Sequence, residues 1–202
     1  MFRSSARWIA AAGAALFLAF GLSGCGINTI PTQDEQVKAA WSQVLNEYQR
    51  RSDLVPNLVA TVKGYAKQEQ TVLTQVIQAR AKATQTTVNL PSDVTSNPEA
   101  FKAFEQSQAG LGQALGRLMV VSERYPDLKS NQNFMALQSQ LEGTENRITV
   151  ARKDYIDAVQ TYNTTLRTIP QRWIAAIFYP SMKVKETFTI SEQAQQAPHV
   201  QF

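Results

Sequence analysis

Residues 134–169 read FMALQSQLEGTENRITVARKDYIDAVQTYNTTLRTI, and this stretch decides the fold class. An apolar or aromatic residue returns at every seventh position: Phe134, Leu141, Ile148, Tyr155, Tyr162 and Ile169. The positions three residues further on are mostly small: Leu137, Thr144, Ala151, Ala158 and Thr165. A seven-residue apolar repeat is typical of a long helix that packs lengthwise on another helix. We therefore predict one helix here, ending near Pro170, whose seam needs a continuous apolar partner.

A second stretch with the same repeat, residues 37–79, supplies a matching seam. Its apolar positions are Val37, Trp41, Val44, Tyr48, Val55, Leu58, Val62, Tyr65, Val72, Val76 and Ala79. Only Arg51 and Glu69 interrupt it. Pro56 predicts a kink rather than an end, because the repeat keeps its frame across the proline. The pattern predicts a single helix from Asp34 to about Thr84, roughly 75 Å long at 1.5 Å per residue.

The middle of the chain connects these two helices. Loop residues fill 84–98, and Asn97 is suited to cap a helix that begins at Pro98 and ends near Arg124. A short apolar helix, Trp173 to Tyr179, precedes an irregular tail, residues 181–202, with a possible extended patch at 186–190. The expected fold is all-α: an elongated antiparallel helical bundle, formed within one chain, of three long helices plus a short C-terminal helix.

The N-terminus has the pattern of a targeting segment. Arg3 and Arg7 precede an uncharged apolar run over residues 8–22, and Leu22-Ser23-Gly24-Cys25 matches the bacterial lipobox. We predict a signal peptide over residues 1–24, lipidation of Cys25, and a short tether over residues 25–33. The alternative is an uncleaved transmembrane helix from about Trp8 to Ile27, which is also long enough to cross a bilayer.

Either anchor places the remaining chain outside the cytoplasm, as a membrane-attached extracytoplasmic or periplasmic domain. Gly26, rather than Asp, follows the cysteine and favours the outer membrane in a cell with two membranes. Removing residues 1–24 takes away Arg3 and Arg7, which leaves 18 basic and 16 acidic side chains. Such a nearly neutral domain would depend on acyl chains rather than on its charge for attachment.

Composition excludes several classes of function. The chain of 202 residues has one Cys, one His and a net charge of +4. One Cys excludes a disulfide framework and a Cys-based zinc cluster, and one His excludes an HExxH metal site. The low net charge argues against a nucleic-acid binder. We find no nucleophile–base pair, so we predict no enzymatic activity, no catalytic residues, no cofactor and no metal.

Charged residues on the two long helices form the candidate interaction site. Arg51 lies in the apolar seam and needs a carboxylate partner, for which Glu145 or Glu142 is suited. The pair has either a structural role or, with Tyr48 and Arg152, forms a polar groove for a ligand. Separately, Gly112 and Gly116 lie four residues apart and predict a notch where another helix packs closely.

Three blocks of sequence carry a family resemblance. They are YQRRSDLVPNLVATVKGYA at residues 48–66, YPDLKSNQNF at residues 125–134 and LEGTENRITVARKDY at residues 141–155. With their flanks they cover most of residues 27–180, and together they resemble the LemA-like proteins. The resemblance implies an all-α, membrane-tethered, extracytoplasmic domain over residues 34–180, with no established catalytic residues.

Two functional hypotheses follow. The first is a non-enzymatic scaffold or adaptor of the bacterial cell envelope, with an envelope protein as partner. The second is a binding module for a small envelope ligand, held in the polar groove around Arg51. A large polar pocket at Arg51 would favour the second hypothesis, and a dry, paired arginine would favour the first.

Overall fold

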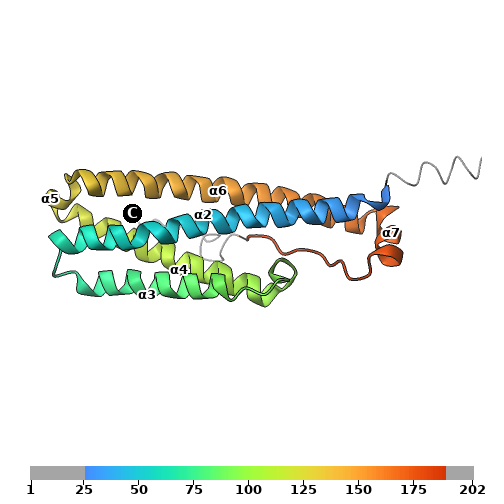
Figure 1. The fold of residues 1–202 in the computed structure, drawn as a ribbon, viewed down its shortest axis with the longest axis horizontal. Coiled ribbons are helices and arrows are strands. Elements are labelled where there is room, and N and C mark those ends of the chain that lie inside the picture. Colours follow the sequence, from blue (N-terminus) through green and yellow to red (C-terminus); the bar gives the residue numbers. More distant parts are fainter. Residues whose placement is uncertain (1–25, 190–202) are drawn as a thin grey trace, which may run out of the picture.

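The structure, a computed structural model, describes residues 26–189. The elements are α2 (Thr29–Tyr65), α3 (Gln70–Val88), the 3₁₀ turn η1 (Val94–Ser96), α4 (Pro98–Glu123), α5 (Pro126–Lys129), α6 (Gln132–Arg167) and α7 (Gln171–Phe178). These described residues contain no strand, and the helices run back and forth along one axis (Figure 1). The prediction of an elongated all-α bundle is confirmed. The predicted signal peptide and Cys25 lie outside the described residues.

Helices α2 and α6 form the antiparallel pair that runs the length of the molecule (Figure 1). The repeat of α6 is buried from Phe134 to Tyr162, against the buried repeat of α2. Ile169 lies beyond the end of α6 and is 64% exposed, so the repeat extends one position further than the helix. The predicted pairing of the two seams within one chain is confirmed.

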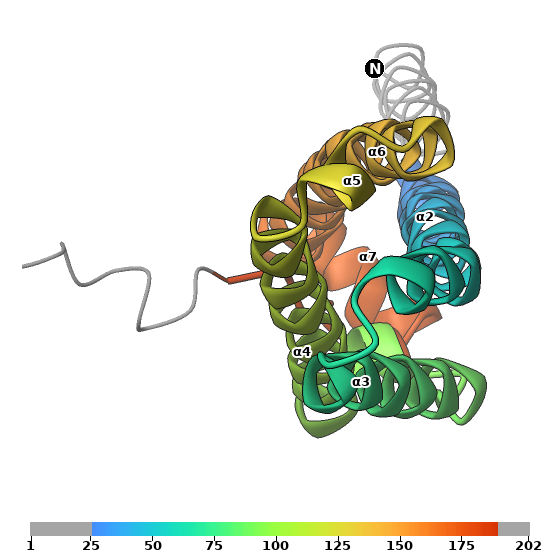
Figure 2. The same cartoon turned by 90° about the vertical axis from the view of Figure 1, so that its left-hand side faces the viewer.

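The predicted single helix from Asp34 to Thr84 is wrong, because the chain turns at residues 66–69. Helix α2 continues through Pro56 and ends at Tyr65, and α3 folds back to pack against α4 and α2. Figure 2, a view along the bundle, shows α2, α3, α4 and α6 around a shared centre. Residues on the two sides of the turn, such as Val62 and Val76, enter the same apolar cluster. The repeat therefore kept its frame across a turn.

The start of α2 also differs from the prediction. The helix begins at Thr29 rather than Asp34, so the predicted tether over residues 25–33 is helical from Thr29 onward. Ile30 is fully buried, which fixes this first turn to the bundle. Pro31 is compatible with the first turn of a helix, where its missing N–H would have no partner within the helix.

The remaining helix boundaries follow the sequence signals. Asn97 caps α4 by accepting a hydrogen bond from the backbone N–H of Ala100 at 3.2 Å, and Pro98 is the first helical residue. Helix α4 ends at Glu123, and Tyr125 directly precedes the short α5, which begins at Pro126. Helix α7 agrees with the predicted short apolar helix.

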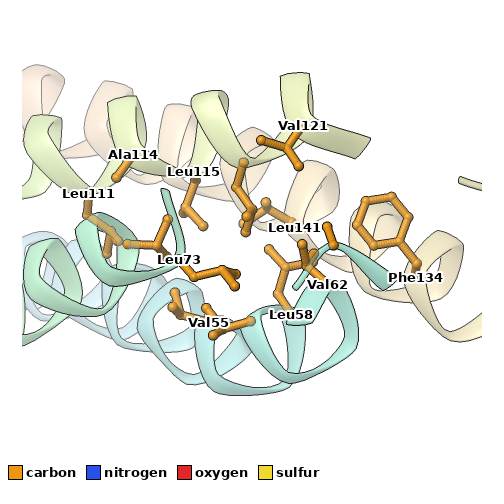
Figure 3. Close-up of a cluster of buried hydrophobic side chains, with 14 of the residues drawn as sticks. Val55, Leu58, Val62, Leu73, Leu111, Ala114, Leu115, Val121, Phe134 and Leu141 are labelled. Atoms are coloured by element: carbon orange, nitrogen blue, oxygen red, sulfur yellow. The ribbon is translucent and has the colours of Figure 1, made fainter. Parts of the chain in front are cut away.

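The core consists of two apolar clusters, one toward each end of the bundle. The cluster near α5 joins all four long helices, and Figure 3 shows Val55, Leu73, Leu115 and Leu141 among its members. The cluster near α7 is rich in aromatic rings. Trp41 has its ring centroid 5.0 Å from that of Phe104 and 5.3 Å from that of Tyr155.

Residues 182–189 have no regular secondary structure, yet they are firmly attached to the bundle, and we call them the strap. Asn163 of α6 accepts from the backbone N–H of Lys185 at 2.8 Å and donates to its carbonyl at 2.9 Å. Tyr155 donates to the carbonyl of Glu186 at 2.8 Å. Phe188 is 7% exposed and joins the aromatic cluster. The possible extended patch at 186–190 is thus an attached segment without a strand over residues 186–189.

Within residues 26–189, no helix combines the length and the apolar character that crossing a membrane requires.

Candidate functional site

Arg51 is a residue of α2, and its almost fully buried side chain contacts α4 and α6. Its Nη1 atom is 3.2 Å from Oε1 of Glu145, the partner that its place in the seam predicted. Its Nη2 atom donates to the carbonyl and to Oε1 of Gln108, at 2.9 and 2.8 Å. The guanidinium also lies over the ring of Tyr48, with Cζ 4.9 Å from the ring centroid. Arg51 is therefore a paired, structural cation that joins three helices.

A layer of polar side chains extends from Arg51 between the two apolar clusters. Gln108 donates to Thr87 of α3 at 3.2 Å, and Ser52 shares a hydrogen bond with Thr84 at 3.1 Å. Arg80 donates to the carbonyl of Ser52 at 2.9 Å. Hydrogen bonds of this kind form at one register of the helices only, so the layer fixes how the four helices slide along one another.

A groove of about 1020 Å³ opens beside this layer, on the side of the aromatic cluster. Helices α4 and α6 form its two walls, Tyr48 and Arg51 of α2 form its base, and residues 186–189 of the strap border it. The four residues predicted as a polar cluster, Tyr48, Arg51, Glu145 and Arg152, all line it. The structure thus brings these four side chains together, although Arg51 points its charge at Glu145 and Gln108 rather than into open space.

The groove combines apolar surface with charges at its rim. Ala109 and Ile156 supply accessible apolar surface beside the buried rings of Phe101 and Phe188. Lys102 and Arg152 supply cations, and Glu105, Glu145 and Glu186 supply carboxylates. The Arg152 guanidinium lies over the Phe188 ring at 4.3 Å from its centroid. Within residues 26–189, no carboxylate oxygen lies within 4.0 Å of the Arg152 guanidinium. An Arg152 without a carboxylate partner, beside accessible apolar surface, suits a ligand or peptide with an apolar group and one negative charge.

Two groups that line the groove have shifted proton affinities. Burial raises the pKa of Glu105, and this outweighs the backbone hydrogen bond of Thr189 and the charge of Arg152, which act to lower it. Burial likewise raises the pKa of Tyr48, against the charges of Arg152 and Arg51. Tyr48 therefore presents a neutral hydroxyl, and the Glu105 carboxylate holds a proton more tightly than an exposed glutamate does.

The predicted glycine notch is wrong. A Cβ atom built on Gly116 would have no neighbour within 4 Å among the described residues. One built on Gly112 would lie 3.7 Å from Nη1 of Arg51, which is ordinary contact with a side chain and not the approach of a second helix backbone. Gly112 instead lines the groove beside Arg51.

Gln108 and Phe188 are the site residues that sequence reasoning missed. Gln108 is 4% exposed and lies on the otherwise apolar face of α4 that also carries Phe104 and Leu111. A glutamine on such a face is the signal that could have paired it with Arg51. Phe188 lies in a segment without apolar periodicity, so no pattern could have placed it in the core.

In residues 26–189, no three His, Cys, Asp or Glu side chains are grouped as a metal site would require. What the geometry offers is a binding groove, held in shape by the polar layer and bordered by a segment of the same chain.

The profile of the LemA family matches residues 40–202. Similar curated proteins are magnetosome protein MamQ 2 of Paramagnetospirillum magneticum, with 28% identity, and magnetosome protein MamQ of Magnetospirillum gryphiswaldense, with 26% identity. Each alignment is 164 positions long and covers 74% of this chain and 60% of the relative. The chain therefore spans less than two thirds of the length of these relatives.

Proposed function

The chain belongs to the LemA family, and on that premise we propose that it is a membrane-anchored, non-enzymatic scaffold or adaptor of the bacterial cell envelope. The proposed anchor is lipid on Cys25, and the bundle lies outside the cytoplasm, at the outer membrane where the cell has two. The MamQ relatives are named as magnetosome proteins, and this likeness supports a role at a membrane for this chain.

Arg51 is buried and paired with Glu145, as the adaptor hypothesis requires, and the attachment of the strap beside the groove between α4 and α6 is the observation that carries the adaptor role. Beside this groove the bundle already binds one extended segment, its own strap, through hydrogen bonds to the strap backbone and a buried aromatic side chain. The groove continues from Phe188 to Arg51, and its lining includes apolar side chains, the cations Lys102 and Arg152, and carboxylates such as Glu105. Backbone hydrogen bonds combined with a side-chain pocket are a general mode of peptide recognition. The partner expected here is a protein segment with an apolar and an acidic residue.

Photo-crosslinking in intact cells tests this role. A photoreactive residue at Gln106 or Thr149, which line opposite walls of the groove, should crosslink to the same envelope protein, identified by mass spectrometry. Val150 is the matched control, because it is 59% exposed next to Thr149 and does not line the groove. Equal crosslinking from Val150, or none from Gln106 and Thr149, would contradict the adaptor role.

The volume of the groove and its two cations favour one second candidate, a binding module for a small envelope ligand. A ligand with an anionic group and an apolar part would place the anion near Arg152 and Lys102. Native mass spectrometry of the protein extracted from membranes should then show a bound small molecule that is lost in the Arg152→Glu variant. Identical spectra of the two proteins, with no added mass, would exclude this candidate.

A further inference from the structure

Helix α7 exposes an unusual amount of apolar surface for its size. Trp173, Ile177 and Phe178 are 59%, 72% and 57% exposed, and Ile169, just before the helix, is 64% exposed. Trp173 and Ile177 are four residues apart and therefore share one face of the helix. The opposite side is used for packing, because Ala175 is buried. Apolar residues gathered at one place on a surface mark an interaction site.

This apolar surface lies at the end of the bundle where the N-terminal segment joins it. Figure 1 shows α7 and the first turn of α2 at the same end of the molecule. Gly26 lies directly against α7, since a Cβ atom built on it would be 3.3 Å from Nε2 of Gln171 and 3.7 Å from Cδ1 of Ile174. Gly26 follows Cys25, the proposed lipid attachment site. If the chain is anchored in a membrane through this cysteine, α7 therefore lies next to that membrane.

The charges at this end have the sign that an anionic membrane attracts. Residues 158–185 contain four basic side chains, Arg167, Arg172, Lys183 and Lys185, and no acidic one. Arg167, Arg172 and Lys183 are exposed. The nearby carboxylate of Asp34 is paired with Lys185 at 2.8 Å and with Lys38 at 2.9 Å. The cations around the apolar face are thus available to lipid headgroups.

We propose that α7 lies in the surface of the membrane to which the chain is anchored, with Trp173 and Ile177 at the boundary between headgroups and acyl chains. Tryptophan is enriched at this boundary, and amphipathic helices bury their apolar face about 5–10 Å into it. The anchor keeps α7 beside the bilayer at a high effective concentration, so a small apolar face suffices for stable contact. The anchor does not raise the effective concentration of a second copy of the chain or of a partner protein in this way. The long axis of the bundle is then directed away from the membrane.

The inference rests on the proposed membrane anchor, and one experiment separates the two. The full chain, carrying Trp8→Phe, is extracted with detergent and reconstituted into vesicles of phosphatidylethanolamine and phosphatidylglycerol. Some vesicles contain phospholipid brominated near the headgroup end of its acyl chains, which quenches tryptophan fluorescence on contact. Of the three tryptophans, only Trp41 and Trp173 then remain, and Trp41 is buried in the bundle. We expect flotation with the vesicles and quenching of the Trp173 emission by the brominated lipid.

Matched variants identify the source of the signal. Trp173→Phe should abolish the quenching, because only Trp41 is left. Ile177→Ser should reduce it, whereas Val120→Ser should not. Val120 is 66% exposed but lies near the end of α4 that leads to α5, and α5 is at the end of the bundle opposite α7 (Figure 1). Flotation without quenching would overturn the placement of α7 and leave the anchor standing. Failure to float would overturn both. Shielding of Trp173 that depends on protein density and not on bromine would instead assign the face to a second copy.

Discussion

Arg51 and Glu145 are unequal partners, because the side chain of the arginine is 5% exposed and that of the glutamate 45%. Water can solvate the glutamate if its partner is removed, whereas the buried arginine depends on its neighbours. The cost of breaking the pair should therefore depend on which residue is changed.

Glu145→Ala should lower the free energy of unfolding by about 3 kcal/mol, since it leaves a buried cation with only the neutral oxygens of Gln108. Arg51→Met keeps most of the side-chain volume and removes the charge, so it should cost only about 1 kcal/mol. Urea unfolding of the fragment from residue 26, followed by circular dichroism, measures both. A larger loss for Arg51→Met than for Glu145→Ala would show that burial of the arginine is not the deciding factor.

Asp34 should make stability depend on pH in the acid range. Burial alone would raise the pKa of Asp34, but hydrogen bonds and charges from Lys185 and Lys38 outweigh it and lower the pKa. A carboxylate with a lowered pKa stabilises the folded state above its unfolded pKa of about 4, and this contribution is lost as the pH falls through the folded value. The wild-type fragment should lose stability below about pH 4, and Asp34→Asn should lose less over the same interval. Parallel pH profiles for the two proteins would contradict this role.

At the scale of elements, the seam of α6 is the main test of the packing. Ile148 is 5% exposed at the middle of this seam, and Val150, two residues further along the same helix, is 59% exposed. Ile148→Asp places an unpaired carboxylate in the core and should unfold the fragment at 25 °C, seen as loss of helical circular dichroism. Val150→Asp should leave the free energy of unfolding within about 0.5 kcal/mol of the wild-type value. A folded Ile148→Asp variant with unchanged melting would refute the packing of α6 on α2.

The same elements show how far sequence reasoning reaches. The seams of α2 and α6 were predictable, because burial against one long neighbour imposes a strict repeat. The turn at residues 66–69 was not predictable from the repeat. Helices α2 and α3 bury their apolar positions in one cluster, so the seven-residue spacing continues across the turn. Glu69 was the available signal. It breaks the seam at the turn and binds Arg124 at 3.1 Å, with the Tyr125 hydroxyl donating to it at 3.3 Å.

The site was predictable in part for a similar reason. A charge in an apolar seam requires a partner, so Arg51 pointed to Glu145. The strap could not be predicted, because its attachment depends on single contacts such as those of Lys185 and Phe188, which follow no period. Gly116 led to a wrong prediction of a packing contact. Its spacing from Gly112 suggested close packing, yet spacing alone does not reveal which face of α4 meets a neighbour.

At the scale of the whole molecule, the anchor decides where the bundle works. Cys25→Ser should abolish labelling of the protein by a radioactive fatty acid and leave a larger, unprocessed precursor on a denaturing gel. The reason is that the lipobox signal is cut only at a cysteine that accepts lipid. Wild type and variant of equal size, both without label, would instead indicate the uncleaved transmembrane helix over residues 8–27.

The attachment of the strap also sets how the molecule would respond to tension. The contacts of Phe188, Glu186 and Lys185 follow one another along the chain, so a pull on the chain beyond Thr189 reaches them in turn, from Phe188 backward. Contacts broken one at a time yield at lower force than contacts broken together. The seam between α2 and α6 is stretched along its length and resists as a whole. Under load the strap would therefore detach first, which opens the border of the groove while the helices stay folded.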